Sequence, residues 1–111
     1  MKLNEILTED CTLCAVPATS KKKILETISE KASEHIENTS TFELLDSLIT
    51  REKVGSTGIG NGIAIPHGRL PNTEQVIAVL VTTSVPIAFD SIDNRPVDIF
   101  IALFVPEAQC Q

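Results

Sequence analysis

The sequence predicts an α/β domain in which helices flank a mixed β-sheet. Two amphipathic stretches with helical spacing occupy residues 20–54 in the first half of the chain. Nearly continuous aliphatic and β-branched runs follow at 76–81 and 97–105. Helices followed by strands in one short chain are typical of a layered α/β sandwich.

The length, composition and charge suit one small globular domain over residues 1–111. Of these 111 residues, 42% are hydrophobic, which is too many for a disordered chain. The net charge is -6, and the only aromatic residues are four Phe. Nucleic-acid binders favour basic faces and stacking aromatics, and anionic lipids repel an acidic surface. We therefore expect neither kind of partner, and a core built from Ile, Leu and Val.

The chain shows no sign of membrane insertion or export. No apolar run approaches the roughly 20 residues that span a bilayer, and charged residues follow the N-terminus where a signal peptide would be apolar. Three cysteines do not suggest a disulfide scaffold. Cys11 and Cys14 have the spacing of a redox or zinc pair, but no second pair follows, so no metal is expected. We expect a cytoplasmic protein.

The first predicted helix covers residues 21–37, with Ser20 as its N-cap. His35 falls on its polar side, where we expect it to be solvated. The lysines at 21–23 are expected to form a solvated face, or alternatively a contact surface for a partner. One face of the helix is apolar at helical spacing and consists of Ile24, Leu25, Ile28, Ala32 and Ile36.

The second predicted helix begins at a capping box formed by Ser40 and Glu43 and ends near Lys53. Its apolar stripe consists of Leu44, Leu45, Leu48 and Ile49.

The second half of the chain is predicted to form strands. A short strand at 63–65 should stop at Pro66, and another at 88–94 should lead into a turn. The continuous apolar runs at 76–81 and 97–105 predict strands that are covered on both faces by helices. Two helices cannot easily provide that cover. We therefore expect the chain to be truncated, with further helices after residue 111.

All five glycines lie between Gly55 and Gly68, and the last one follows His67 directly. A glycine-rich loop can hold phosphate through its backbone N–H groups. A P-loop requires Gly-Lys-Ser/Thr at the start of a helix, and a dinucleotide site requires its glycines between a strand and a helix. Neither order occurs here. We therefore expect phosphate to be carried on a side chain rather than on a bound nucleotide.

His67 is the only good nucleophile in this segment, and we expect its imidazole to project from a strand end behind Pro66. Neutral imidazole attacks phosphorus well and leaves well when protonated, which suits reversible transfer. The alternative is a histidine that caps the strand end by hydrogen bonding. The candidate donors to phosphate oxygens are Arg51, Arg69, Ser56 and Thr57.

The segment from Thr50 to Gly68, TREKVGSTGIGNGIAIPHG, resembles the signature of the mannitol/fructose-class enzyme IIA (EIIA) domains of the bacterial phosphotransferase system. Its Gly-Asn-Gly and Pro-His-Gly steps are most similar to the nitrogen-regulatory type. The segment 86–98 and the preceding helix pair also resemble that family. The resemblance covers residues 1–111 and implies an EIIA type-2 domain that is incomplete at its C-terminus, because members continue to a second active-site histidine.

The resemblance implies a phosphotransferase component that carries a phosphoryl group on histidine and needs no cofactor. His67 matches the phospho-acceptor, with the phosphoryl group expected on Nε2 (tele), and Arg51 matches an arginine that neutralises phosphate. The remaining residues expected at or beside the phosphate are Ser56, Thr57, Gly58, Gly60, Asn61 and Gly68.

The implied phosphoryl donor is an HPr-like protein, charged by enzyme I from phosphoenolpyruvate. Nitrogen-type members act mainly as regulators that bind targets such as potassium transporters and sensor kinases according to their phosphorylation state. The alternatives are a fructose/mannitol-type component that passes phosphate to a IIB domain, and a pure binding regulator without relay. A hydrolase or metal enzyme has the least support, because no acidic or metal-binding cluster lies near His67 in the sequence.

Overall fold

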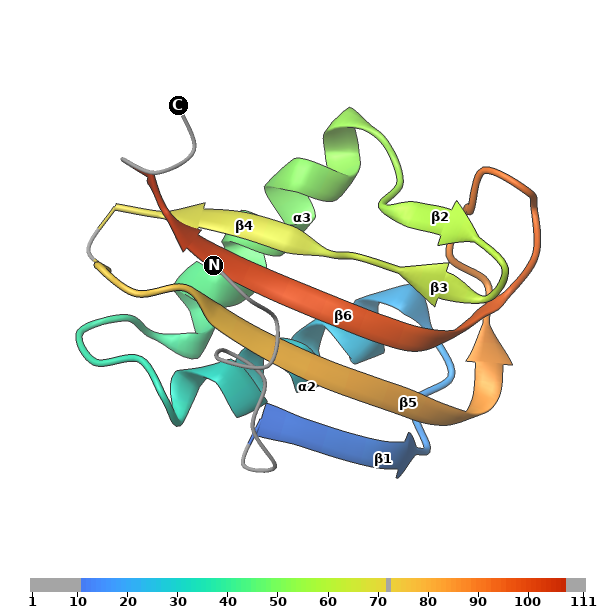
Figure 1. Ribbon diagram of the computed structural model, residues 1–111, viewed down its shortest axis with the longest axis horizontal. Coiled ribbons are helices and arrows are strands. Elements are labelled where there is room, and N and C mark those ends of the chain that lie inside the picture. Colours follow the sequence, from blue (N-terminus) through green and yellow to red (C-terminus); the bar gives the residue numbers. More distant parts are fainter. Residues whose placement is uncertain (1–10, 72, 108–111) are drawn as a thin grey trace.

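A computed structural model describes residues 11–71 and 73–107. Two helices pack on one face of a six-stranded mixed sheet (Figure 1). The sheet order is β1-β5-β6-β3-β2, and β4 also pairs with β6. The elements are β1 (Thr12–Val16), α2 (Lys21–Ser33), α3 (Thr41–Val54), β2 (Gly58–Gly60), β3 (Ile63–Ala64), β4 (His67–Leu70), β5 (Ile77–Ile87) and β6 (Val97–Pro106). The predicted fold class is confirmed.

Both helices begin at the predicted caps. The hydroxyl of Ser20 accepts a hydrogen bond from Lys23 N, and Ser40 and Glu43 form the complete capping box. Helix α2 ends at Ser33, so the prediction of a helix to residue 37 was too long by four residues. His35 therefore lies beyond the helix, where it is exposed. All five residues of the predicted apolar face of this segment are nevertheless buried.

The core lies between the two helices and the sheet. Leu44 and Leu48 of α3 are fully buried with the apolar face of α2 and alternate residues of β5 and β6. The prediction of a purely aliphatic core was wrong, because Phe89, Phe100 and Phe104 are among its largest buried side chains. The rings of Phe89 and Phe100 pack edge to face with their centroids 5.3 Å apart. The fourth phenylalanine, Phe42, lies on the surface.

Strand β6 has two faces of different exposure. Phe100, Ala102 and Phe104 are fully buried toward the helices, whereas the residues between them are only partly buried. Helices on both faces were expected, but in the described part of the chain α2 and α3 lie on the same face (Figure 1). No helix among the described residues is long and apolar enough to cross a membrane.

Strand β4 was missed because Pro66 was expected to end the preceding strand. Proline lacks an N–H, but the Pro66 carbonyl still accepts a hydrogen bond from Leu103 N at 2.9 Å. The pairing with β6 therefore continues past Pro66 in the same register, from Ala64 opposite Phe100 to His67 opposite Leu103. His67 consequently begins a new strand. The turn at 88–94 was expected to start as a strand but contains none.

Helix α3 crosses β4 so closely that a side chain cannot fit at Gly68. A Cβ atom placed there would lie 2.7 Å from Ser47 Cβ and 3.2 Å from the Ser47 carbonyl carbon. The backbone carbon cannot move without moving the helix. The absence of a side chain at Gly68 therefore sets the distance between α3 and the strand that carries His67.

We predict that Gly68→Ala destabilises the protein by about 1–3 kcal/mol, the usual cost of overpacking. Gly55→Ala is the matched control, because its added Cβ would meet no atom within 4 Å and its φ of 165° is extended. That variant should be neutral or slightly stabilising. Urea unfolding measures both, and equal effects of the two substitutions would contradict the packing argument.

Candidate functional site

His67 is held by a hydrogen bond at each ring nitrogen. Its Nδ1 lies 3.0 Å from the carbonyl oxygen of Ile65, and its Nε2 lies 3.1 Å from Nε of Arg51. Arginine Nε always carries its proton, so Nε2 of His67 must be the acceptor in the second bond. The ring proton is then on Nδ1, which donates to Ile65. In this neutral tautomer the lone pair of Nε2 is available to act as a nucleophile.

Arg51 occupies the last turn of α3 and is held at both ends of its guanidinium. Besides the bond from Nε, its Nη1 donates to the carbonyl oxygen of Gly55 at 2.8 Å. A guanidinium has five N–H donors, and these two bonds use two of them. The charged group is thus pre-positioned beside the nucleophilic nitrogen of His67.

His67 and Arg51 lie in a cleft of about 850 Å³ between α3 and β4, which we call the α3–β4 cleft. Arg69 also lines it, because residues two apart on β4 share a face of the strand. Phe42 and Val54 stand at its edge with 74% and 83% of their surfaces exposed. The other lining residues are Glu43, Asp46, Ser47, Thr50, Leu70 and Pro71.

Beyond Gly55, the glycine-rich loop makes side-chain hydrogen bonds outside the α3–β4 cleft. The hydroxyl of Ser56 donates to the Phe89 carbonyl, and the N–H of Asn61 donates to Asp93 at 2.9 Å. Among the described residues, none of the predicted loop ligands Ser56, Thr57, Gly58, Gly60 and Asn61 lines the α3–β4 cleft. Gly68 packs against Ser47 and in this way sets the distance between α3 and the strand that carries His67. A direct role in phosphate binding for these six residues remains a prediction.

Asp93 anchors the hairpin turn between β2 and β3. Gly60 and Gly62 both have positive φ there, and the Asp93 carboxylate lies against that turn. Backbone N–H donors from Asn61 and then Arg95 hold the pKa of Asp93 below its ordinary value. The carboxylate therefore stays ionised at neutral pH and fixes the turn from outside. Asp93 thus has a structural role at this turn.

Cys11 and Cys14 are the two cysteines in the described part of the chain. Cys11 is buried and Cys14 is exposed, so they lie in different environments although only two residues separate them. In the part of the chain that the structure describes, no three His, Cys, Asp or Glu side chains group together in a way that could hold a metal ion. Cys110 lies outside the described residues.

Most residues of the cleft wall were not predicted from the sequence. Glu43, Ser47, Thr50 and Val54 share the helix face of Arg51 at spacings of three and four residues, so helical periodicity around Arg51 could have found them. No such pattern in the sequence indicates that the Ile65 carbonyl contacts His67 Nδ1, because this contact depends on the backbone path around Pro66.

Comparisons with known proteins place this chain in a family. The sequence profile described as "Phosphoenolpyruvate-dependent sugar phosphotransferase system, EIIA 2" matches residues 5–111. The chain belongs to this family. It is also similar to the "Nitrogen regulatory protein" of Klebsiella oxytoca, with 48% identity over 110 residues, which cover 98% of this chain and 67% of that protein.

Solved structures of other EIIA proteins share the fold. The nitrogen regulatory protein IIA-Ntr from Neisseria meningitidis superposes with a TM-score of 0.90 at 34% identity, over 95% of this chain and 71% of that one. The mannitol IIA of Escherichia coli superposes with a TM-score of 0.76 over 95% and 76%, but at 18% identity it shows the fold alone. The EIIA fold and the nitrogen-regulatory likeness expected from the sequence are both confirmed.

We predict that the neutral ring of His67 is protonated on Nδ1, because Arg51 Nε can only donate to Nε2. Nitrogen-15 NMR at alkaline pH distinguishes the two tautomers, and a His67→Gln variant assigns the signals. A ring protonated mainly on Nε2 would show that Arg51 does not make this bond in solution.

Proposed function

We propose that this EIIA domain carries a phosphoryl group on Nε2 of His67, which it accepts from an HPr-like protein. The observation that carries the proposal is the pair of bonds to the ring. Ile65 holds the proton on Nδ1, and Arg51 places a fixed positive charge at the nucleophilic nitrogen. Phosphoryl transfer depends mainly on positioning and on electrostatic stabilisation of the oxygens, and both are provided here.

The transfer step exchanges one nitrogen–phosphorus bond for another. The lone pair of Nε2 attacks phosphorus as the bond to the donor imidazole breaks, and the electron pair of that bond returns to the donor nitrogen. The proton stays on Nδ1 of His67, hydrogen-bonded to the Ile65 carbonyl, throughout. Arg51 gives up its bond to Nε2 and donates instead to the phosphate oxygens, where a planar guanidinium can bind two at once.

Phosphorylation would change what the α3–β4 cleft presents to a partner. A phosphoryl group adds about 1.5 to 2 negative charges at neutral pH. The cleft edge already combines exposed Phe42 and Val54 with acidic Glu43 and Asp46. A partner that docks on this apolar edge in the unmodified state would then meet a different charge beside it.

The regulatory output is favoured over sugar transport by the likeness to proteins named nitrogen regulatory protein. The targets would be proteins such as transporters or sensor kinases, and a cytoplasmic location is part of the proposal. A sugar-transport component that passes the group to a IIB domain would use the same transfer step. A pure binding regulator would use the cleft without the transfer.

We predict that phosphoenolpyruvate, enzyme I and an HPr-type donor convert the protein to an acid-labile adduct one phosphoryl group heavier. His67→Ala should abolish the adduct, because it removes the nucleophile. His35→Ala is the control, since His35 is exposed and outside the cleft, and it should leave the adduct unchanged. Intact-mass measurement of the wild type and the two variants tests this prediction. A wild-type protein that stays unmodified would leave only the alternative of a pure binding regulator.

We predict that Arg51→Lys slows phosphoryl transfer by about 10²-fold, as expected when one preorganised donor to a charged transition state is lost. Lysine keeps the positive charge but lacks the planar guanidinium, which donates to His67 Nε2 and to the Gly55 carbonyl at the same time. Arg95→Lys makes the same chemical change at an exposed residue that does not line the cleft. Rapid-quench kinetics should show a near-normal rate for that control, and equal rates in both variants would remove Arg51 from the mechanism.

A further inference from the structure

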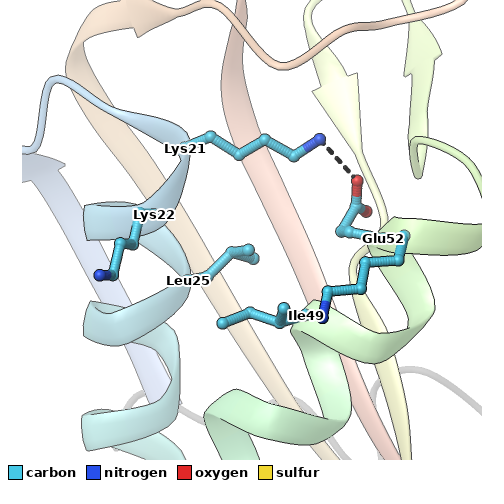
Figure 2. A pocket seen from close by; sticks show the side chains of 6 residues that line it. Lys21, Lys22, Leu25, Ile49 and Glu52 are labelled. Carbon is cyan, nitrogen blue, oxygen red and sulfur yellow. Dashed lines mark ion pairs between the residues drawn. The ribbon is translucent and has the colours of Figure 1, made fainter.

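A buried carboxylate lies on a different side of α3 from Arg51. Glu52 follows Arg51 directly, and its side chain is only 6% exposed. Its Oε2 lies 2.9 Å from Nζ of Lys21, the first residue of α2. Figure 2 shows Lys21 reaching from α2 across to Glu52 on α3, above Leu25 and Ile49. These four residues line a pocket of about 410 Å³.

Lys21 is itself fixed by the loop that follows β5. Its ammonium lies 4.6 Å from the centre of the Phe89 ring and 3.4 Å from Asp90 Oδ2. The lysine therefore joins the start of α2, the end of α3 and the loop at 89–90. Because the Glu52 carboxylate is buried, loss of Lys21 would leave that negative charge without its partner.

The other oxygen of Glu52 holds the loop that leaves α3. Its Oε1 accepts hydrogen bonds from both the backbone N–H and the hydroxyl of Thr57, the first at 2.9 Å. Thr57 is only 5% exposed, so these bonds are shielded from water. One carboxylate oxygen thus fixes the position and the orientation of Thr57.

From Thr57 the contacts continue to the ring of His67. The carbonyl of Thr57 accepts a hydrogen bond from Ile65 N at 3.0 Å, and the carbonyl of Ile65 meets His67 Nδ1 at 3.0 Å. Two residues before Thr57, the carbonyl of Gly55 holds Arg51. Both bonds to the imidazole thus depend on where the segment 55–57 lies.

We propose that Glu52, held by Lys21, is a positioning residue for the His67 centre. It fixes the segment 55–57 so that the Ile65 carbonyl sets the ring tautomer and the Gly55 carbonyl aims Arg51 at Nε2. The kinetic consequence rests on the proposed phosphoryl-carrier function. The effect on the tautomer does not, because it concerns the unmodified ring.

A purely structural role would predict a different outcome. A buried ion pair can often be replaced by apolar side chains without loss of stability. Such a replacement would leave nothing to accept the two bonds from Thr57. The positioning role therefore predicts a disturbed ring even in variants that remain folded.

The test compares Glu52→Met, Glu52→Gln and Lys21→Met with the wild type. Glu52→Met removes both functions of the carboxylate, and we expect a mixture of His67 tautomers by nitrogen-15 NMR and phosphoryl transfer slowed by up to about 10²-fold. Glu52→Gln keeps an acceptor for Thr57 but loses the ion pair, so its effects should be intermediate, like those of Lys21→Met. Glu34→Gln, at the exposed Lys31–Glu34 pair, is the matched control and should leave both readouts unchanged.

Thr57→Val and Thr57→Ser carry the test if the Glu52 variants fail to fold. Valine removes the hydroxyl and should reproduce the mixed tautomers, whereas serine restores the hydroxyl and should rescue them. A wild-type tautomer in folded Glu52→Met, or in Thr57→Val, would overturn the proposal even if thermal stability fell. A wild-type protein that is never phosphorylated would overturn the proposed function instead, and the tautomers would still decide this inference.

Discussion

The close crossing of α3 over β4 is the constraint on which the site depends. Arg51 and His67 are sixteen residues apart in the sequence, and they could not meet if one extra side chain held the helix away from the strand. Gly68 has no side chain at the point where Ser47 approaches. The glycine beside the histidine therefore acts first through packing, and through that packing it determines the geometry of the hydrogen bond between Arg51 and His67.

The same crossing gives α3 two functional sides. Arg51 faces the α3–β4 cleft, whereas Glu52 faces the pocket toward α2, because successive helical residues point about 100° apart. The positively charged Arg51 at the cleft is thus followed by the negatively charged Glu52 in the interior. Lys21 holds the interior charge and the Gly55 carbonyl holds the cleft charge, so movement of the C-terminal end of α3 would reach the ring.

Much of the fold could be predicted because its signals are local. The capping residues Ser20 and Ser40 and the apolar face of α2 depend on neighbours within one or two turns, and they appear in the structure as expected. The errors arose where contacts distant in sequence override local signals. The pairing with β6 continues past Pro66, and β4 begins at His67, because β6 lies beside this segment.

The sequence by itself determined the fold class, the family signature and the histidine on which the site centres, because residue type and spacing are enough to reveal them. The tertiary structure alone decided which groups meet the ring of His67, with Arg51 Nε at Nε2 and the Ile65 carbonyl at Nδ1. It also directed the glycine-rich loop toward Phe89 and Asp93, outside the α3–β4 cleft. The physical reason is that hydrogen-bond partners depend on which backbone carbonyls and side chains meet in space, and spacing along the chain does not encode that meeting.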